Sequence, residues 1–99
     1  MILTQLFYVH PGQEAVFDAF EATVIPLLAH HGGELLLRLR PQGPSVVSAS
    51  IEVPYEVHLV RFPSDAALDA YTDDPVRQAA LPQRAASFRS VLVVKGAEV

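Results

Sequence analysis

The pattern of hydrophobic and polar positions along the chain predicts four β-strands and two helical regions. Strands are expected where leucine, β-branched and aromatic residues gather between turn signals, at 2–9, 34–40, 55–62 and 88–95. Helices are expected where apolar residues recur every three or four positions, at 13–31 and 64–86. The predicted order of elements is therefore β-α-β-β-α-β.

Local signals define the ends of the two helical regions. Gly32 is a natural stop for the first helix, which Pro26 should kink, although two separate helices would also fit. Ser64 caps the second region, and Asp74-Pro75 restarts it with a capping aspartate before a proline at the first helical position. Pro82 is expected to end or bend that piece, leaving at most one further turn.

The segment between the second and third strands has no helical period. Residues 41–54 contain proline, glycine and three serines, which predict a loop. Residues 46–47 and 50–53 could instead pair as a short hairpin arm that reaches a partner subunit. Both alternatives remain open from the sequence.

The second strand has the cleanest alternation in the chain. Three leucines on one side are expected to face the helices: Leu35, Leu37 and Leu39. The other side carries a mixture of apolar and charged residues: Glu34, Leu36, Arg38 and Arg40. Such a mixed face is unfavourable when it is fully exposed to solvent, but it is suitable for lining a semi-enclosed cavity.

The order of elements predicts an α+β fold. Two split β-α-β units with right-handed crossovers give a ferredoxin-like plait, a four-stranded antiparallel sheet with both helices on one face. The other face of the sheet is then uncovered, and a second copy of the chain is the simplest cover for it. We therefore expect one domain over residues 1–99 that forms a homodimer.

Composition supports self-association and excludes some partners. Apolar residues make up 51% of the chain and charged residues only 18%, which suggests hidden apolar surface. A net charge of −4 argues against nucleic acid as a partner, and no apolar run is long enough to span a membrane. The absence of cysteine removes disulfides and thiolate chemistry and fits a cytoplasmic protein.

Arginine and histidine on the strands are the best candidates for chemistry. Arg38 and Arg40 could hold a carboxylate or an enolate, or they could pair with Glu34, Glu56 or an acid of a partner. His58 could act as a general base near neutral pH, provided that its side of the strand lines the pocket. The phase of that strand is ambiguous, so the alternatives are a hydrogen-bonded core histidine and a histidine that faces the helices.

The other motifs of the chain give weaker evidence for a functional site. Tyr8 and His10 share one face at the end of the first strand and could form a pocket rim that binds substrate, or simply close the strand. No histidine or acidic residues have the spacing of a metal site, so no metal or bound cofactor is expected. The chain also has no phosphate-binding loop and no nucleophile elbow.

Several stretches together resemble the dimeric α/β-barrel superfamily. They are Gly32-Gly33-Glu34 running into Leu-Leu-Leu-Arg38, the polar loop after it, Arg61-Phe62-Pro63-Ser64, Asp73-Asp74-Pro75, Arg84 and Val91–Gly96. The chain is similar, more narrowly, to small barrel domains of unknown function. The resemblance implies a ferredoxin-like dimer that forms an α/β barrel. Since the superfamily includes cofactor-independent monooxygenases, isomerases, stress-responsive proteins and ligand-binding domains, it does not choose a function.

Two functions follow as hypotheses. The first is an enzyme without metal or cofactor, similar to a monooxygenase or an isomerase, acting on a small anionic or aromatic substrate. Arg38 would then stabilise the anion and His58 would move the proton. The second is a non-catalytic dimer that binds a small-molecule ligand or responds to stress. A third alternative is a purely structural association module with a packed, dry interface and no cavity.

Overall fold

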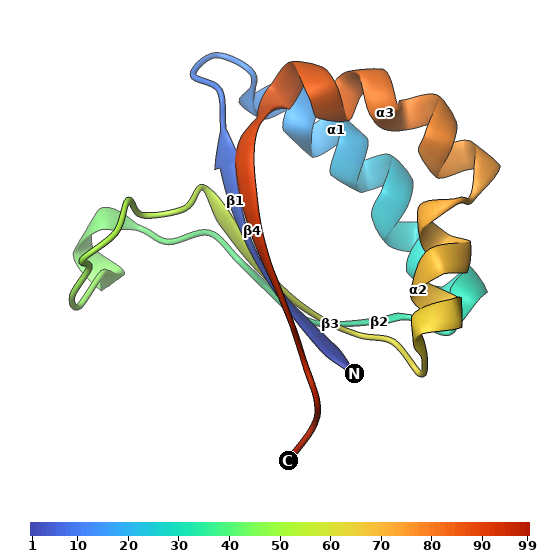
Figure 1. The fold of residues 1–99 in the computed structure, drawn as a ribbon. Helices are drawn as coiled ribbons and strands as arrows, with labels where there is room; N and C mark the ends of the chain where they lie inside the picture. The colour runs from blue at the N-terminus through green and yellow to red at the C-terminus, as the bar shows by residue number, and fades with distance from the viewer.

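The computed structural model describes residues 1–99 as a four-stranded antiparallel sheet covered on one face by helices (Figure 1). The strands are β1 (Ile2–Val9), β2 (Glu34–Leu39), β3 (Glu56–Arg61) and β4 (Phe88–Gly96). They lie in the order β2-β3-β1-β4, so β1 and β3 form the centre and β2 and β4 the edges. The predicted ferredoxin-like plait is confirmed.

The first helical region changes its winding near Pro26. It consists of the α-helix α1 (Glu14–Val24) and the 3₁₀ helix η1 (Ile25–His31). Proline has no N–H to bond the carbonyl four residues back, so the tighter winding begins where that bond is lost. The region ends at Gly32, whose φ of 73° is in the left-handed region, as the sequence predicted.

The second helical region comprises α2 (Asp65–Thr72) and α3 (Pro75–Ser87). Both predicted caps are formed. The Ala67 N–H donates to the Ser64 hydroxyl over 3.1 Å, and the Val76 N–H donates to the Asp74 carboxylate over 2.8 Å. Pro82 does not end the helix, contrary to one of the two outcomes predicted from the sequence. Instead α3 continues through Pro82 as one helix to Ser87.

The segment between β2 and β3 is a loop that contains only the short 3₁₀ helix η2 (Gly43–Ser45). The alternative of a hairpin arm is wrong, since residues 46–47 and 50–53 form no strands. Figure 1 shows the loop extending from the sheet on the side away from the helices. It therefore lies beside the uncovered face of the sheet.

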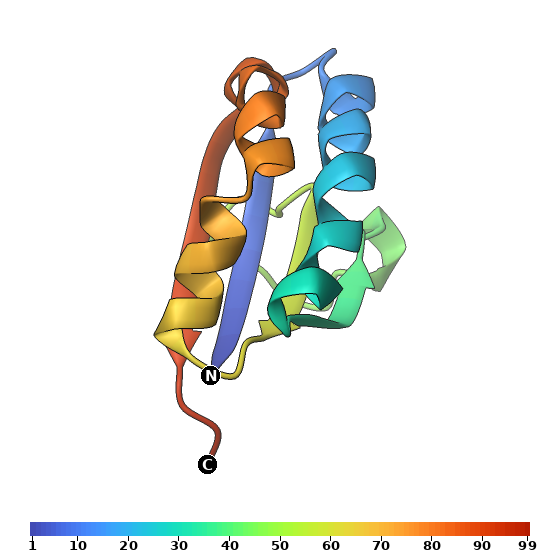
Figure 2. The ribbon, with the colours of Figure 1, turned by 90° about the vertical axis from the view of Figure 1, so that its right-hand side faces the viewer.

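The core lies between the sheet and the helices, which cross in front of the strands in Figure 2. At one end, Phe7, Phe17, Phe20 and Phe88 pack with ring centroids 5.3–5.6 Å apart. At the other end, Leu3, Leu28, Val60 and Phe62 form a buried cluster. No helix in the structure has both the length and the apolar character needed to cross a membrane.

A β-bulge in β2 overturns the predicted alternation of that strand. Leu35 pairs with Val60, but Leu37, not Leu36, pairs with Leu59, so Leu36 is an extra residue in the ladder. An extra residue reverses the faces of every side chain after it. Leu37 and Leu39 consequently lie on the uncovered face, whereas Arg38 and Arg40 lie on the helix face.

Candidate functional site

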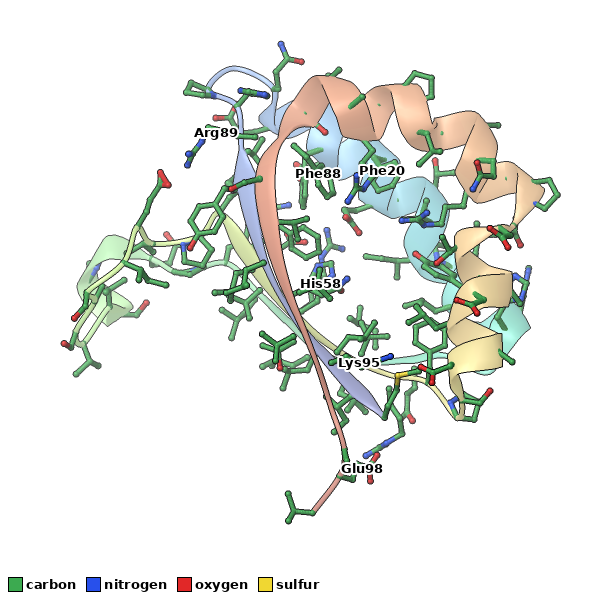
Figure 3. All side chains as sticks on the ribbon, in the orientation of Figure 1. Phe20, His58, Phe88, Arg89, Lys95 and Glu98 are labelled. Carbon is green, nitrogen blue, oxygen red and sulfur yellow. The ribbon has the colours of Figure 1, made fainter.

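A cavity of about 170 Å³ lies between the sheet and the helix layer. Thirteen of its nineteen lining residues are hydrophobic, so polar groups are few and stand out. The other six are Gln5, Glu21, His58, Thr72, Arg77 and Arg84. In Figure 3 the His58 side chain points from the sheet into the space between sheet and helices. The cavity is thus on the helix face, and not on the uncovered face where the alternation of β2 placed it.

Arg38 and Arg40 do not line this cavity, because both are engaged by the carboxylate of Glu56. The Arg38 Nε donates to Glu56 over 3.1 Å, and the Arg40 Nε donates to it over 2.8 Å. Arg40 also donates to Asp18 on α1 over 2.5 Å. Two guanidinium groups therefore face two carboxylates. Of the two roles expected for these arginines, the structure shows ion pairing and not a free site for an anionic ligand.

Glu56 is the centre of this network and is fully buried. Burial alone would raise the pKa of its carboxyl group, but hydrogen bonds from His58, Arg40 and Arg38 outweigh burial and lower the pKa to about 2. The carboxylate is therefore ionised at neutral pH. It can only accept hydrogen bonds in that state.

His58 is brought to the cavity by the phase of β3. Glu56, His58 and Val60 are buried on the helix face, whereas Val57 and Leu59 lie on the other. The His58 Nε2 lies 2.5 Å from a Glu56 oxygen, and the Phe7 ring packs edge-on at 4.6 Å between centroids. Since Glu56 only accepts, Nε2 carries the proton and donates it. Nδ1 is then left with its lone pair and no hydrogen bond to the protein.

Glu21 is a second acid of the site, contributed by α1. Its side chain is buried at the cavity wall and makes no hydrogen bond to another side chain. Burial raises the pKa of Glu21 to about 7, with a smaller opposing effect from His58. Glu21 therefore changes its charge near neutral pH, inside a largely apolar cavity.

The structure does not bring Tyr8 and His10 to this site. The Tyr8 hydroxyl donates to the carbonyl of Glu52 over 2.9 Å, and the Arg89 guanidinium stacks on its ring. His10 is exposed after the end of β1. Tyr8 is joined to the loop beside the uncovered face, so a role in substrate binding stays a prediction for both residues.

The sequence prediction missed Glu21 and Arg77 and gave no site role to Glu56 or Arg84. The sequence did contain signals for three of these residues, which are Glu21, Arg77 and Arg84. Glu21 interrupts the apolar stripe of α1, since it is four residues after Phe17 and three before Val24. Arg77 and Arg84 are seven residues apart and so share one face of α3.

The structure contains no group of three or more histidine, cysteine or acidic side chains placed to hold a metal ion. The chemistry available to the cavity from the chain itself is proton transfer, hydrogen bonding and charge pairing.

Comparison by sequence gives no identification, because no family model and no curated protein matches the chain. Comparison by structure gives several matches. A protein of unknown function from Rhodopseudomonas palustris superposes with a TM-score of 0.78 at 18% identity, covering 94% of this chain and 77% of the other. A DABB family protein with a ferredoxin-like fold from Mesorhizobium loti gives 0.67 at 19% identity, covering 99% and 95%.

A dimeric ferredoxin-like protein of unknown function from Jannaschia sp. gives a TM-score of 0.64 at 25% identity, covering 95% of this chain and 96% of the other. These likenesses show that the chain shares the ferredoxin-like fold with uncharacterised proteins, some of them described as dimeric. They assign no activity.

The Glu56 network predicts a large cost for neutralising its carboxylate. Glu56→Gln should lower the free energy of unfolding by on the order of 3 kcal/mol, because it removes the charge that holds two guanidinium groups. The matched variant Glu52→Gln, which breaks an exposed pair with Arg89, should cost less than about 1 kcal/mol. Urea denaturation at neutral pH measures both. Equal costs would contradict the central place of Glu56.

The raised pKa of Glu21 predicts a specific dependence of the free energy of unfolding on pH. Its folded pKa is raised from 4.5 to about 7, so the stability linked to the protonated form is complete below pH 4.5 and is lost as pH rises through 7. The loss should approach roughly 3 kcal/mol. Glu21→Gln should remove it, whereas the exposed Glu14→Gln should not. Urea denaturation at a series of pH values tests this, and parallel curves for wild type and Glu21→Gln would refute it.

Proposed function

We propose that the chain acts as a homodimer that binds a small molecule in the cavity of each protomer and moves a proton on it through His58. The observation that carries the proposal is the Glu56–His58 pair, buried at the wall of a cavity large enough for a ligand. The reaction class is cofactor-independent proton transfer, as in an isomerase.

The pairing of His58 with an ionised carboxylate supports the role of general base. Glu56 accepts a hydrogen bond from the Nε2–H, which fixes the tautomer and the orientation of the ring and stabilises the imidazolium that forms. Nδ1 takes a proton from an acidic C–H of the ligand, and the electron pair of that bond remains on the ligand as an enolate. The imidazolium then returns the proton to another carbon, so that no oxidant or reductant is consumed.

The volume and lining of the cavity limit the ligand. An apolar cavity of roughly 150 Å³ accommodates benzene, so the cavity of about 170 Å³ suits a molecule of one ring. Its mostly hydrophobic wall favours an apolar ring over a strongly hydrated molecule such as a sugar. A ring ketone or lactone meets both conditions and carries an acidic C–H next to its carbonyl group.

The uncovered face of the sheet supports the homodimer. Eight apolar side chains from all four strands lie on this face: Ile2, Leu6, Leu37, Leu39, Val57, Leu59, Leu92 and Val94. Four of them are 41–53% exposed, which is a large apolar surface for a small domain. A second copy would cover this face with an identical surface, and similar structures are described as dimeric.

The dimer is tested by a pair of matched substitutions. Leu92 and Val76 are equally exposed, at 49% and 51%, but Leu92 is on the uncovered face and Val76 is on α3. Light scattering should give the mass of a dimer for the wild type and for Val76→Glu. Leu92→Glu should give a monomer, because its charge would be buried against the partner. A monomeric wild type would refute the homodimer.

The proton transfer is tested by deuterium exchange into cyclohexanone in D₂O, followed by NMR. The wild type should accelerate exchange at the α carbons by about 100-fold or more over imidazole at the same concentration. His58→Gln should abolish this acceleration, whereas His30→Gln, at an exposed histidine, should keep it.

Two results would contradict the proposed chemistry. Unchanged acceleration in His58→Gln would place the base elsewhere. Binding of the ketone without exchange would support the non-catalytic, ligand-binding dimer in place of the enzyme.

A further inference from the structure

We propose that Arg77 and Arg84 form an anion site on the helix wall of the cavity, and that the ligand is therefore a ring-sized carboxylate. The inference rests on the proposed function, which places a small molecule in this cavity. It adds the charge of that molecule, the residues that bind it and its orientation toward His58.

The ion pairs of the chain single out these two arginines. The sequence has seven lysine and arginine residues. Five of them make ion pairs with carboxylates: Arg38, Arg40, Arg61, Arg89 and Lys95. The remaining two, Arg77 and Arg84, make none, and both line the cavity.

Arg77 and Arg84 are partly buried and have no carboxylate partner to balance their charges. The Nε of Arg77 is buried and has no hydrogen-bond partner. Burial lowers the pKa of Arg84, and Arg77 lowers it further by repulsion. A buried donor without an acceptor and two mutually repelling cations are both unfavourable. A bound anion would relieve the repulsion between the two cations.

Aromatic rings hold the two guanidinium groups in place. Arg77 lies 5.3 Å from the centroid of the Tyr71 ring, and Arg84 lies 4.7 Å from that of Phe88. The two arginines are two turns apart on one face of α3, roughly 10 Å along its axis. The planar group of either can bind a carboxylate through two parallel hydrogen bonds, and the other adds positive charge from the side.

The acids near the cavity do not neutralise this pair. Glu21 is the one acidic residue that lines the cavity, and it makes no hydrogen bond to either arginine. Even an ionised Glu21 would leave one of the two positive charges unbalanced. Arg38 and Arg40, in contrast, are balanced by Glu56 and Asp18. An anionic ligand is therefore attracted to α3, and not to β2.

The location of the anion site sets the orientation of the ligand. Arg77 and Arg84 project from α3, whereas His58 projects from β3 on the opposite wall. A carboxylate held at α3 leaves the ring of the molecule to extend across the cavity toward Nδ1 of His58. The carboxylate thus anchors the molecule while the proton is moved at the other side of the ring.

Isothermal titration calorimetry with benzoate and with benzamide tests the inference, because these probes share size and shape and differ in charge. The wild type should bind benzoate at least tenfold more tightly than benzamide. Arg77→Gln should remove this preference and leave the affinity for benzamide unchanged. The matched variant Arg89→Gln should bind like the wild type, since Arg89 is exposed and paired with Glu52.

Arg77→Lys keeps the charge and should retain part of the preference, which separates loss of the anion site from loss of the fold. Equal affinities of the wild type for the two probes, no binding of either, or an unchanged preference in Arg77→Gln would overturn the anion site. If the wild type accelerates deuterium exchange but shows no preference for benzoate, the anion site alone is overturned. If it prefers benzoate but does not accelerate exchange, only the proton transfer is overturned.

Discussion

The buried carboxylate of Glu56 is the interaction on which the arrangement of the site depends. An ionised group without solvent is stable only if donors surround it. Glu56 receives them from Arg38 on β2, from Arg40 directly after β2 and from His58 on its own strand. Arg40 extends the network to Asp18 on α1. One side chain thereby ties the edge strand, the central strand and the first helix together, and the same contact orients His58 toward the cavity.

Much of the fold could be predicted because its signals are local. The caps at Ser64 and Asp74 and the stop at Gly32 each act within a few residues, so the sequence alone locates them. The winding after Pro26 and the continuity of α3 through Pro82 were harder. A proline removes one hydrogen bond in either case, but packing against the rest of the molecule decides whether the helix tightens, ends or continues.

The site was less predictable because it depends on which face of the sheet each side chain occupies. The sequence names His58 as a candidate, but the orientation of its side chain follows from the pairing of β3 with two neighbours, which periodicity within one strand does not give. Arg38 and Arg40 were placed on the wrong face, since nothing in the run of leucines marks Leu36 as an extra residue. The arginines of α3 form a pair only when the helix packs over the cavity.

The extra residue in β2 also has an evolutionary consequence. β2 is an edge strand with one neighbour, so it accommodates an insertion that a central strand could not without moving two ladders. Loss of that single residue would leave a regular ladder in which Leu37 still pairs with Leu59 and Arg38 with His58, so the arginines would stay on the helix face. A protein of this fold could therefore gain or lose the residue at this position and still keep its charged groups in the interior.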